Sequence, residues 1–175
     1  MKKKWTGNSG NEWTVKKKRD ESTNVKCLIE EKAVTQIRTL CKEYETLEWI
    51  AGLQGRIEDE QIVISEIKLF EQEVQGAYCE FTDNGSTEMA QSDCIGWIHS
   101  HNKMGVFFSG TDEETCKFNK VSIVVNNELN AVGKYRIKVM KNKDAYANLD
   151  IYYETPEIKY DPKIVTGKQI GRAHV

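Results

Sequence analysis

Three observations predict that this chain folds as an α/β protein. Residues 30–45 carry apolar side chains three and four positions apart, which is the period of a helix with one buried face. Runs rich in β-branched and aromatic residues follow along the chain, separated by short polar turns. With 175 residues, of which 39% are hydrophobic, the chain can bury one substantial core but is short for two. We therefore predict one domain in which helices accompany a sheet.

The first half of the expected sheet follows the helix. Residues 46–58 and 59–73 have the composition of two neighbouring antiparallel strands joined by a charged turn. Residues 74–81 are expected to add a third strand to the same sheet. Residues 83–93 contain an Asn-Gly pair and serine residues, and this composition predicts a loop.

The second half of the expected sheet begins with residues 94–101, whose apolar and aromatic make-up predicts a strand. A helix is expected to begin near Ser109. Residues 121–126 form a candidate core strand that pairs with residues 131–140 across a short turn. Residues 146–153 are expected to add a last strand at the edge of the sheet.

The charge balance excludes several classes of partner. The net charge of −2 and the isoelectric point near 6.0 leave no basic field that would hold nucleic acid or an anionic membrane. The five cysteines are widely spaced and include no C-x-x-C pair, which argues against a disulfide framework and a four-cysteine zinc site. No apolar run has the length of a signal peptide or a membrane span. We expect a cytoplasmic protein.

Both ends of the chain differ in composition from its middle. Residues 1–24 are polar and lack periodicity, so we expect a flexible arm there. A single domain is expected over residues 25–168. The last residues, 169–175, read QIGRAHV, which resembles the translation of a sequencing-library adapter and is expected to be a non-native tail. His174 is therefore not considered as a ligand.

Two histidines stand two positions apart in the stretch GWIHSHNKMGVFFSGTD. On an extended strand, His99 and His101 project the same way with Cα atoms about 6–7 Å apart, so that both imidazoles can reach one ion. Ser109 is suited to cap a helix, which places Asp112 in the first helical turn. The positive end of the helix dipole favours the ionised carboxylate at that position.

Two imidazoles and one carboxylate make three protein ligands, the usual number for a catalytic zinc whose fourth position holds water, whereas a structural zinc normally has four. Such a centre keeps a net positive charge that activates the water and polarises a carbonyl, so hydrolysis is its natural use. An H-x-H pair alone more often marks a solvated pair at a strand end than a metal site, and S-x-x-D alone fits an ordinary helix cap. The combination of both at this spacing is much rarer.

The residues HSHNKMGVFFSGTD resemble the JAMM signature of the MPN-domain zinc metalloproteases. Upstream, EWIAGLQG matches the E-x-x-x-G-x-x-G pattern of that family with Glu48, Gly52 and Gly55. The resemblance covers residues from about 30 to 140. It implies the MPN fold, a strongly curved mixed or mainly antiparallel sheet flanked by helices, with a layout similar to cytidine deaminase.

The resemblance also implies a role for each motif residue. His99, His101 and Asp112 correspond to the ligands of a Zn²⁺ cofactor, and Glu48 corresponds to a general acid/base on a strand after the first helix. Ser109 corresponds to a hydrogen-bond donor to the tetrahedral oxyanion. Many relatives have proline after the second histidine, where this chain has Asn102. Proline stiffens that loop, so its absence does not affect the ligand assignment.

By resemblance, the function is zinc-dependent hydrolysis of a peptide or isopeptide bond, typically at the C-terminus of ubiquitin or a ubiquitin-like protein. One alternative is a non-catalytic MPN scaffold, although the silent members of the family lack parts of the motif that this chain has. Another is a JAMM peptidase that processes sulfur-carrier proteins or acts in a phage tail or on the cell wall. The sequence indicates neither the substrate nor the oligomeric state.

Overall fold

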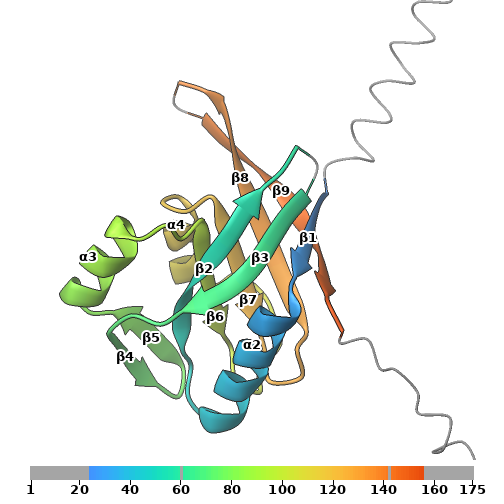
Figure 1. The fold of residues 1–175 in the computed structure, drawn as a ribbon. Helices are drawn as coiled ribbons and strands as arrows, with labels where there is room; N and C mark the ends of the chain where they lie inside the picture. The colour runs from blue at the N-terminus through green and yellow to red at the C-terminus, as the bar shows by residue number, and fades with distance from the viewer. Residues whose placement is uncertain (1–23, 60, 142, 156–175) are drawn as a thin grey trace, which may run out of the picture.

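The computed structural model describes residues 24–59, 61–141 and 143–155 (Figure 1). The expected arm, apart from Asn24, and the expected tail lie outside these residues. The elements in chain order are β1 (Val25–Ile29), α2 (Glu31–Glu43), β2 (Ile50–Ile57), β3 (Gln61–Lys68), β4 (Gln72–Gln75), β5 (Tyr78–Phe81), α3 (Asp83–Gln91), β6 (Gly96–Ser100), α4 (Gly110–Cys116), β7 (Val121–Val125), β8 (Ala131–Met140) and β9 (Lys143–Tyr153).

The main sheet closes into a barrel with the strand order β1-β3-β2-β6-β7-β8-β9. Its strands are mixed in direction: β1 is parallel to both β3 and β9, and β6 is parallel to β7, whereas the remaining neighbours are antiparallel. This confirms the predicted α/β class with a mixed sheet flanked by helices. The antiparallel pairing of β2 with β3 and of β7 with β8 is also confirmed.

The expectation that the last strand lies at a sheet edge is wrong. Strand β9 pairs with β8 on one side and with β1 on the other, in a register that joins Val25 to Leu149 and Ile29 to Tyr153. Strand β1 itself had not been predicted. Because its partners β3 and β9 are distant in sequence, no local turn motif predicts the pairing of β1.

Residues 74–81 do not form the predicted third strand of the main sheet. The chain reverses at Gly76 and Ala77, and β4 and β5 form a separate two-stranded sheet. The Gln72 side chain joins this hairpin to β2, because its amide accepts from the Ile50 N–H at 2.9 Å and donates to the Ile50 carbonyl at 2.8 Å. The Gln72 side chain thus forms with the Ile50 backbone the two hydrogen bonds that a neighbouring strand would otherwise form.

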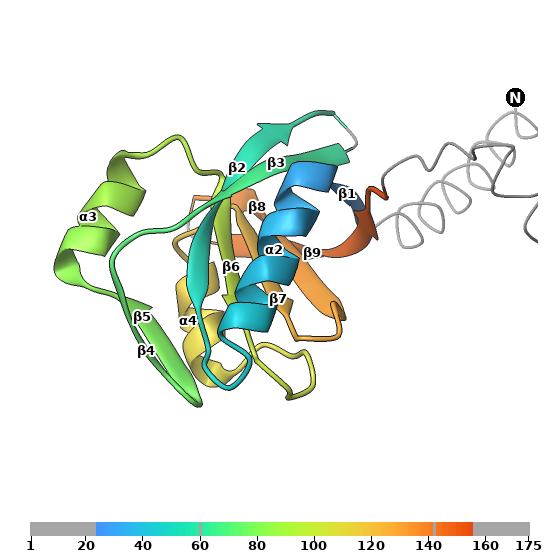
Figure 2. The ribbon, with the colours of Figure 1, turned by 60° about the horizontal axis from the view of Figure 1, so that its bottom comes forward.

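Residues 83–91, which were expected to lie in a loop, form helix α3. The Thr82 hydroxyl caps its first turn by accepting from the Gly85 N–H at 3.2 Å. A Cβ atom at Gly85 would lie 2.0 Å from the Glu71 carbonyl oxygen, so the glycine allows close packing rather than a turn. In both views α3 and the β4–β5 hairpin lie together beside the barrel (Figures 1 and 2).

The two faces of the barrel wall have different neighbours. Helix α2 packs against the barrel (Figure 2). Of the apolar face predicted for it, Ala33, Val34, Ile37, Leu40 and Cys41 are buried in a core shared with strands of the barrel, whereas Tyr44 is exposed. On β6, Ile98 belongs to this core, whereas Trp97 packs with Ile50 and with Cys116 of α4 in a second cluster. By strand alternation His99 shares the face of Trp97, opposite α2.

The described helices include none that is both long enough and apolar enough to cross a lipid bilayer.

Candidate metal centre

Strand β6 delivers both histidines of the predicted site. His99 is the fourth residue of the strand, and His101 follows its last residue. The ring centroids are 5.0 Å apart with the planes nearly perpendicular, and both side chains are buried. The imidazole of His99 also lies beside Trp97, with 5.9 Å between ring centroids. The structure therefore brings the two histidines together as the strand geometry predicts.

Glu48 reaches the same place from the segment before β2. It does not lie on a strand, as the resemblance implied, but two residues before β2 begins. Its backbone N–H donates to the Gln75 carbonyl at 2.9 Å, which attaches the segment to the β4–β5 hairpin. The residue is only 4% exposed, and its Oε2 lies 3.0 Å from His99 Nε2. Glu48 is thus a buried carboxylate beside the histidine pair.

The two glycines of the upstream motif have packing roles. A Cβ atom at Gly52, which pairs with Trp97 in the sheet, would lie 2.6 Å from Cys94 Sγ. At Gly55 the register of β2 with β3 shifts, and a Cβ atom there would lie 1.9 Å from the Val63 carbonyl oxygen. The glycines therefore allow β2 to pack closely against its neighbours, and the position of Glu48, two residues before β2, depends on this packing.

Helix α4 supplies Asp112. Ser109 is the N-cap, and a capping box links it to Asp112: the Asp112 N–H donates to Ser109 Oγ at 3.2 Å, and the Ser109 N–H donates to Asp112 Oδ2 at 2.7 Å. The Ser109 hydroxyl also donates to Oδ2 at 2.6 Å. Asp112 therefore has the predicted place in the first turn of a helix.

Asp112 contacts both histidines. Its Oδ1 lies 2.9 Å from His99 Nδ1, and its Oδ2 lies 3.5 Å from His101 Nε2. Burial opposes ionisation of this carboxyl, but the hydrogen bonds with His101, His99 and Ser109 outweigh it and hold the pKa of Asp112 well below its usual range. Asp112 is consequently an anion at neutral pH, as a metal ligand must be.

The surrounding backbone sets the orientation of His101. Its Nδ1 lies 3.1 Å from the Gly105 carbonyl oxygen, which can only accept, so Nδ1 carries the proton and donates. Nε2, which faces Asp112, is then the ring nitrogen left to bind a metal when it gives up its proton. A ring nitrogen held in this way by a backbone carbonyl is the usual support of a metal-binding histidine.

The donor set fits a divalent transition metal. One ligand atom each of Glu48, His99 and His101 lies within 4.8 Å of the others, and all three residues are buried. Asp112 adds a second carboxylate in contact with both imidazoles. Imidazole nitrogen and carboxylate oxygen are the donors that zinc accepts in catalytic sites. Two buried carboxylates that pair with no lysine or arginine of residues 24–59, 61–141 or 143–155 also call for a positive partner.

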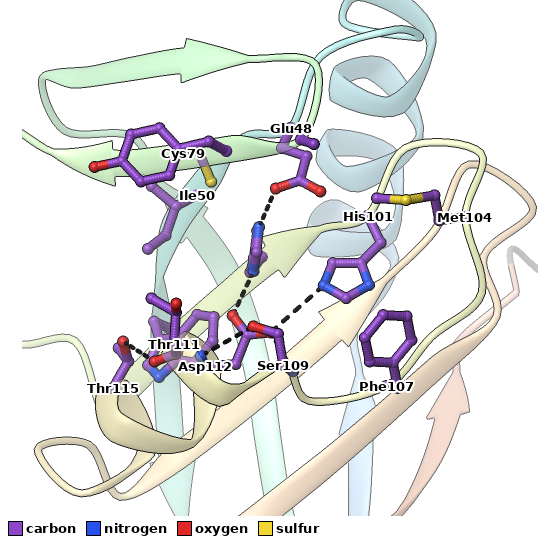
Figure 3. A pocket seen from close by; sticks show the side chains of 14 residues that line it. Glu48, Ile50, Cys79, His101, Met104, Phe107, Ser109, Thr111, Asp112 and Thr115 are labelled. Carbon is purple, nitrogen blue, oxygen red and sulfur yellow. Dashed lines mark hydrogen bonds and ion pairs between the residues drawn. The ribbon is translucent and has the colours of Figure 1, made fainter.

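These side chains lie in a cavity of about 240 Å³ (Figure 3). The β4–β5 hairpin forms one wall, and the loop between β6 and α4 together with α4 forms the other. Besides Glu48, His99, His101 and Asp112, the lining residues are Ile50, Ala77, Tyr78, Cys79, Trp97, Met104, Phe107, Ser109, Thr111 and Thr115. All five residues predicted for the site thus line one cavity.

Asn102 has a role that sequence reasoning missed. Its φ of 42° lies in the left-handed region, which proline cannot adopt, so the proline of many relatives has no place in this loop conformation. Its side-chain amide donates to the Gly76 carbonyl at 2.6 Å, and its backbone carbonyl accepts from the Asn127 N–H at 2.7 Å. Asn102 therefore ties the histidine loop to the opposite wall. The available signal was the tolerance of asparagine for this backbone region.

Comparison with known proteins identifies the family. A search among proteins of curated function finds no match. The profile of a family described as prokaryotic homologs of the JAB domain (Prok-JAB) matches residues 30–139, more than half of the 175 residues. The matched range runs from the N-cap of α2 into β8 and includes every residue of the predicted site. Together with the mixed sheet flanked by helices, this match shows that the chain belongs to the JAB/MPN domain family and has the MPN fold.

Proposed function

We propose that this protein is a zinc-dependent metalloprotease or isopeptidase. The observation that carries the proposal is the convergence of two histidines and two carboxylates, all buried, at one cavity. A scaffold domain would have no use for such a cluster, because burying charged groups costs free energy that packing of apolar residues does not. Groups of this kind are typically retained for chemistry.

We assign His99, His101 and Asp112 as the zinc ligands and Glu48 as the general acid/base. Asp112 accepts two hydrogen bonds from Ser109, which orient its carboxylate as ligands are usually oriented. Glu48 has a different environment: within the described chain, His99 is its one side-chain hydrogen-bond partner, and its carboxylate lines the cavity. A carboxylate with one oxygen that no described side chain hydrogen-bonds is suited to accept and donate protons.

When bound, zinc supplies Lewis-acid chemistry that lowers the pKa of water and polarises the scissile carbonyl. Glu48 takes a proton from the attacking water through its carboxylate and passes it to the leaving amine. Tyr78 and Cys79 of the hairpin and Phe107 of the opposite loop limit the access of bulk water to this proton transfer. The residues of the chain thus hold the metal ion, shield the site from bulk water and protonate the leaving amine. The reaction class is hydrolysis of an amide bond.

The proposed substrate is the C-terminal bond of a ubiquitin-like protein or another polypeptide. Purified zinc-loaded protein, incubated with a panel of ubiquitin-like fusions that includes carriers ending in Gly-Gly, is expected to release at least one partner. A chelator should stop the release, and added zinc should restore it. Mass spectrometry of the products identifies the bond. If neither the fusions nor a mixed peptide library is cleaved in the presence of zinc, the domain acts as a scaffold.

Ser109 provides a further test, because its hydroxyl lines the cavity and also caps α4. As an oxyanion donor it would have to turn from Asp112 toward the substrate. We expect Ser109→Ala to keep the zinc but to lower kcat about a hundredfold, the usual cost of losing one such donor. A thermal melt beside the rate measurement separates this role from capping.

The matched control for Ser109→Ala is Thr82→Ala, which removes the hydroxyl cap of α3 outside the cavity. Both variants are expected to lose about 1 kcal/mol of stability through the lost cap. If Ser109→Ala melts like Thr82→Ala and turns over like the unchanged protein, Ser109 is a cap alone.

A further inference from the structure

Three large apolar side chains stand exposed around the mouth of the catalytic cavity. Tyr78 comes from β5 on one wall. Met104 and Phe107 come from the loop on the other wall (Figure 3). Their exposed fractions are 39%, 40% and 54%. An apolar cluster left open beside a site typically contacts a ligand, because its exposure to water is otherwise unfavourable.

Hydrogen bonds fix both segments that carry these side chains. The turn before Tyr78 is held by the Asn102 amide, which donates to the Gly76 carbonyl at 2.6 Å. The Met104 carbonyl accepts from the Asn126 amide at 3.0 Å. The ring of Phe107 packs edge-on against His101, with 4.8 Å between centroids. The three side chains are thus presented by an ordered frame, which lowers the entropic cost of binding a ligand.

Among the residues that the structure describes, no lysine or arginine lines the cavity. Two nearby lysines have acidic partners elsewhere: Lys103 pairs with Glu45 at 2.9 Å, and Lys134 pairs with Glu113. When a divalent metal ion is bound, its charge balances those of Glu48 and Asp112, and the described lining offers no lysine or arginine to pair with an acidic group of the substrate. An acidic side chain beside the cleaved bond would lose hydration without gaining a partner, which disfavours it relative to an apolar side chain.

We propose that Tyr78, Met104 and Phe107 form a specificity surface that selects polypeptides with a large, uncharged apolar side chain next to the cleaved bond. The proposal rests on the proposed hydrolytic function and names the substrate class of that site. The substrate's apolar side chain lies between the hairpin and the loop and contacts Phe107. In a carrier that ends in Gly-Gly, this side chain belongs to the leaving partner, because glycine occupies the other side of the bond.

The test uses a library of acetylated and amidated peptides that differ at the positions flanking the cleaved bond. We expect zinc-loaded protein to cleave beside Phe, Leu, Met or Tyr at least tenfold faster, in kcat/KM, than beside Asp or Glu. Phe107→Ala should lower kcat/KM for the Phe-containing peptide about tenfold or more, because one large apolar contact discriminates by that order. Its effect on the matching Ala-containing peptide should be small.

Phe118→Ala is the matched control, since Phe118 is 81% exposed in the turn that follows α4 and does not line the cavity. It should cleave both peptides like the unchanged protein, and both variants should keep their zinc. The surface proposal is overturned if cleavage shows no preference for apolar flanking residues. It is equally overturned if Phe107→Ala and Phe118→Ala have the same kinetics.

A binding measurement separates this proposal from the proposed function. Calorimetry with the Glu48→Gln variant should show tighter binding of the Phe-containing peptide than of its Asp counterpart, whether or not turnover occurs. Selective binding without any cleavage by the unchanged protein would retain the specificity surface and reject the hydrolase. Cleavage without selective binding would retain the hydrolase and reject the surface.

Discussion

Glu48→Gln is expected to abolish turnover while the zinc remains bound. Glutamine keeps the shape of the side chain and its contact with His99, which is 3.0 Å in the structure, but it cannot take a proton from water. Loss of a general base typically lowers the rate a hundredfold to ten-thousandfold. Because the lost interaction belongs to the transition state, kcat should fall while KM changes little.

The matched control is Glu45→Gln, three residues earlier in the chain. The Glu45 carboxylate is mostly exposed and pairs with Lys103 at the surface, so its loss should leave turnover unchanged. Near-normal hydrolysis by Glu48→Gln would contradict the proposed mechanism even if zinc is present. Loss of zinc from Glu48→Gln would instead make Glu48 a ligand, which its distance to the two histidines allows.

His101→Ala is expected to remove most of the zinc and all detectable hydrolysis. The protein should hold one zinc per chain, and two remaining ligands cannot retain the ion against water. Elemental analysis after dialysis measures the zinc content, and His99→Ala should give the same result. His174→Ala, which changes the remaining histidine of the sequence, serves as the control and should keep its zinc.

A folding defect must be separated from ligand loss in these variants. His101 is buried, and alanine there leaves the Gly105 carbonyl without the donor it has in the structure. His101→Gln keeps a donor of similar size and should fold like the unchanged protein by circular dichroism while still binding zinc poorly. If the zinc content of all these histidine variants equals that of the unchanged protein, the ligand assignment is wrong.

Much of the site could be read from local spacing. The pair His99 and His101 needs only an extended backbone to converge, and Asp112 needs only a helix that begins at Ser109. Both conditions are set by residues close in the sequence. The same holds for α2, whose buried face follows the period of its apolar residues.

Glu48 could not be placed by such reasoning, because it lies 51 residues before His99. Its assignment came from the resemblance of the E-x-x-x-G-x-x-G pattern to a known family. The structure supplies the physical reason: Gly52 and Gly55 stand where side chains would collide with Cys94 and with the backbone of Val63. Close packing of β2 therefore brings Glu48 to the histidines.

The sequence by itself determined the α/β class, the helix α2, the histidine strand and the spacing of the candidate ligands, since these depend on the local period of side chains. Only the tertiary structure decided the closure of the barrel by β1 and β9, the separate β4–β5 hairpin and the apolar mouth of the cavity. Backbone hydrogen bonds between strands are nearly independent of side-chain identity. Which distant strands pair is therefore settled by the packing of the whole core.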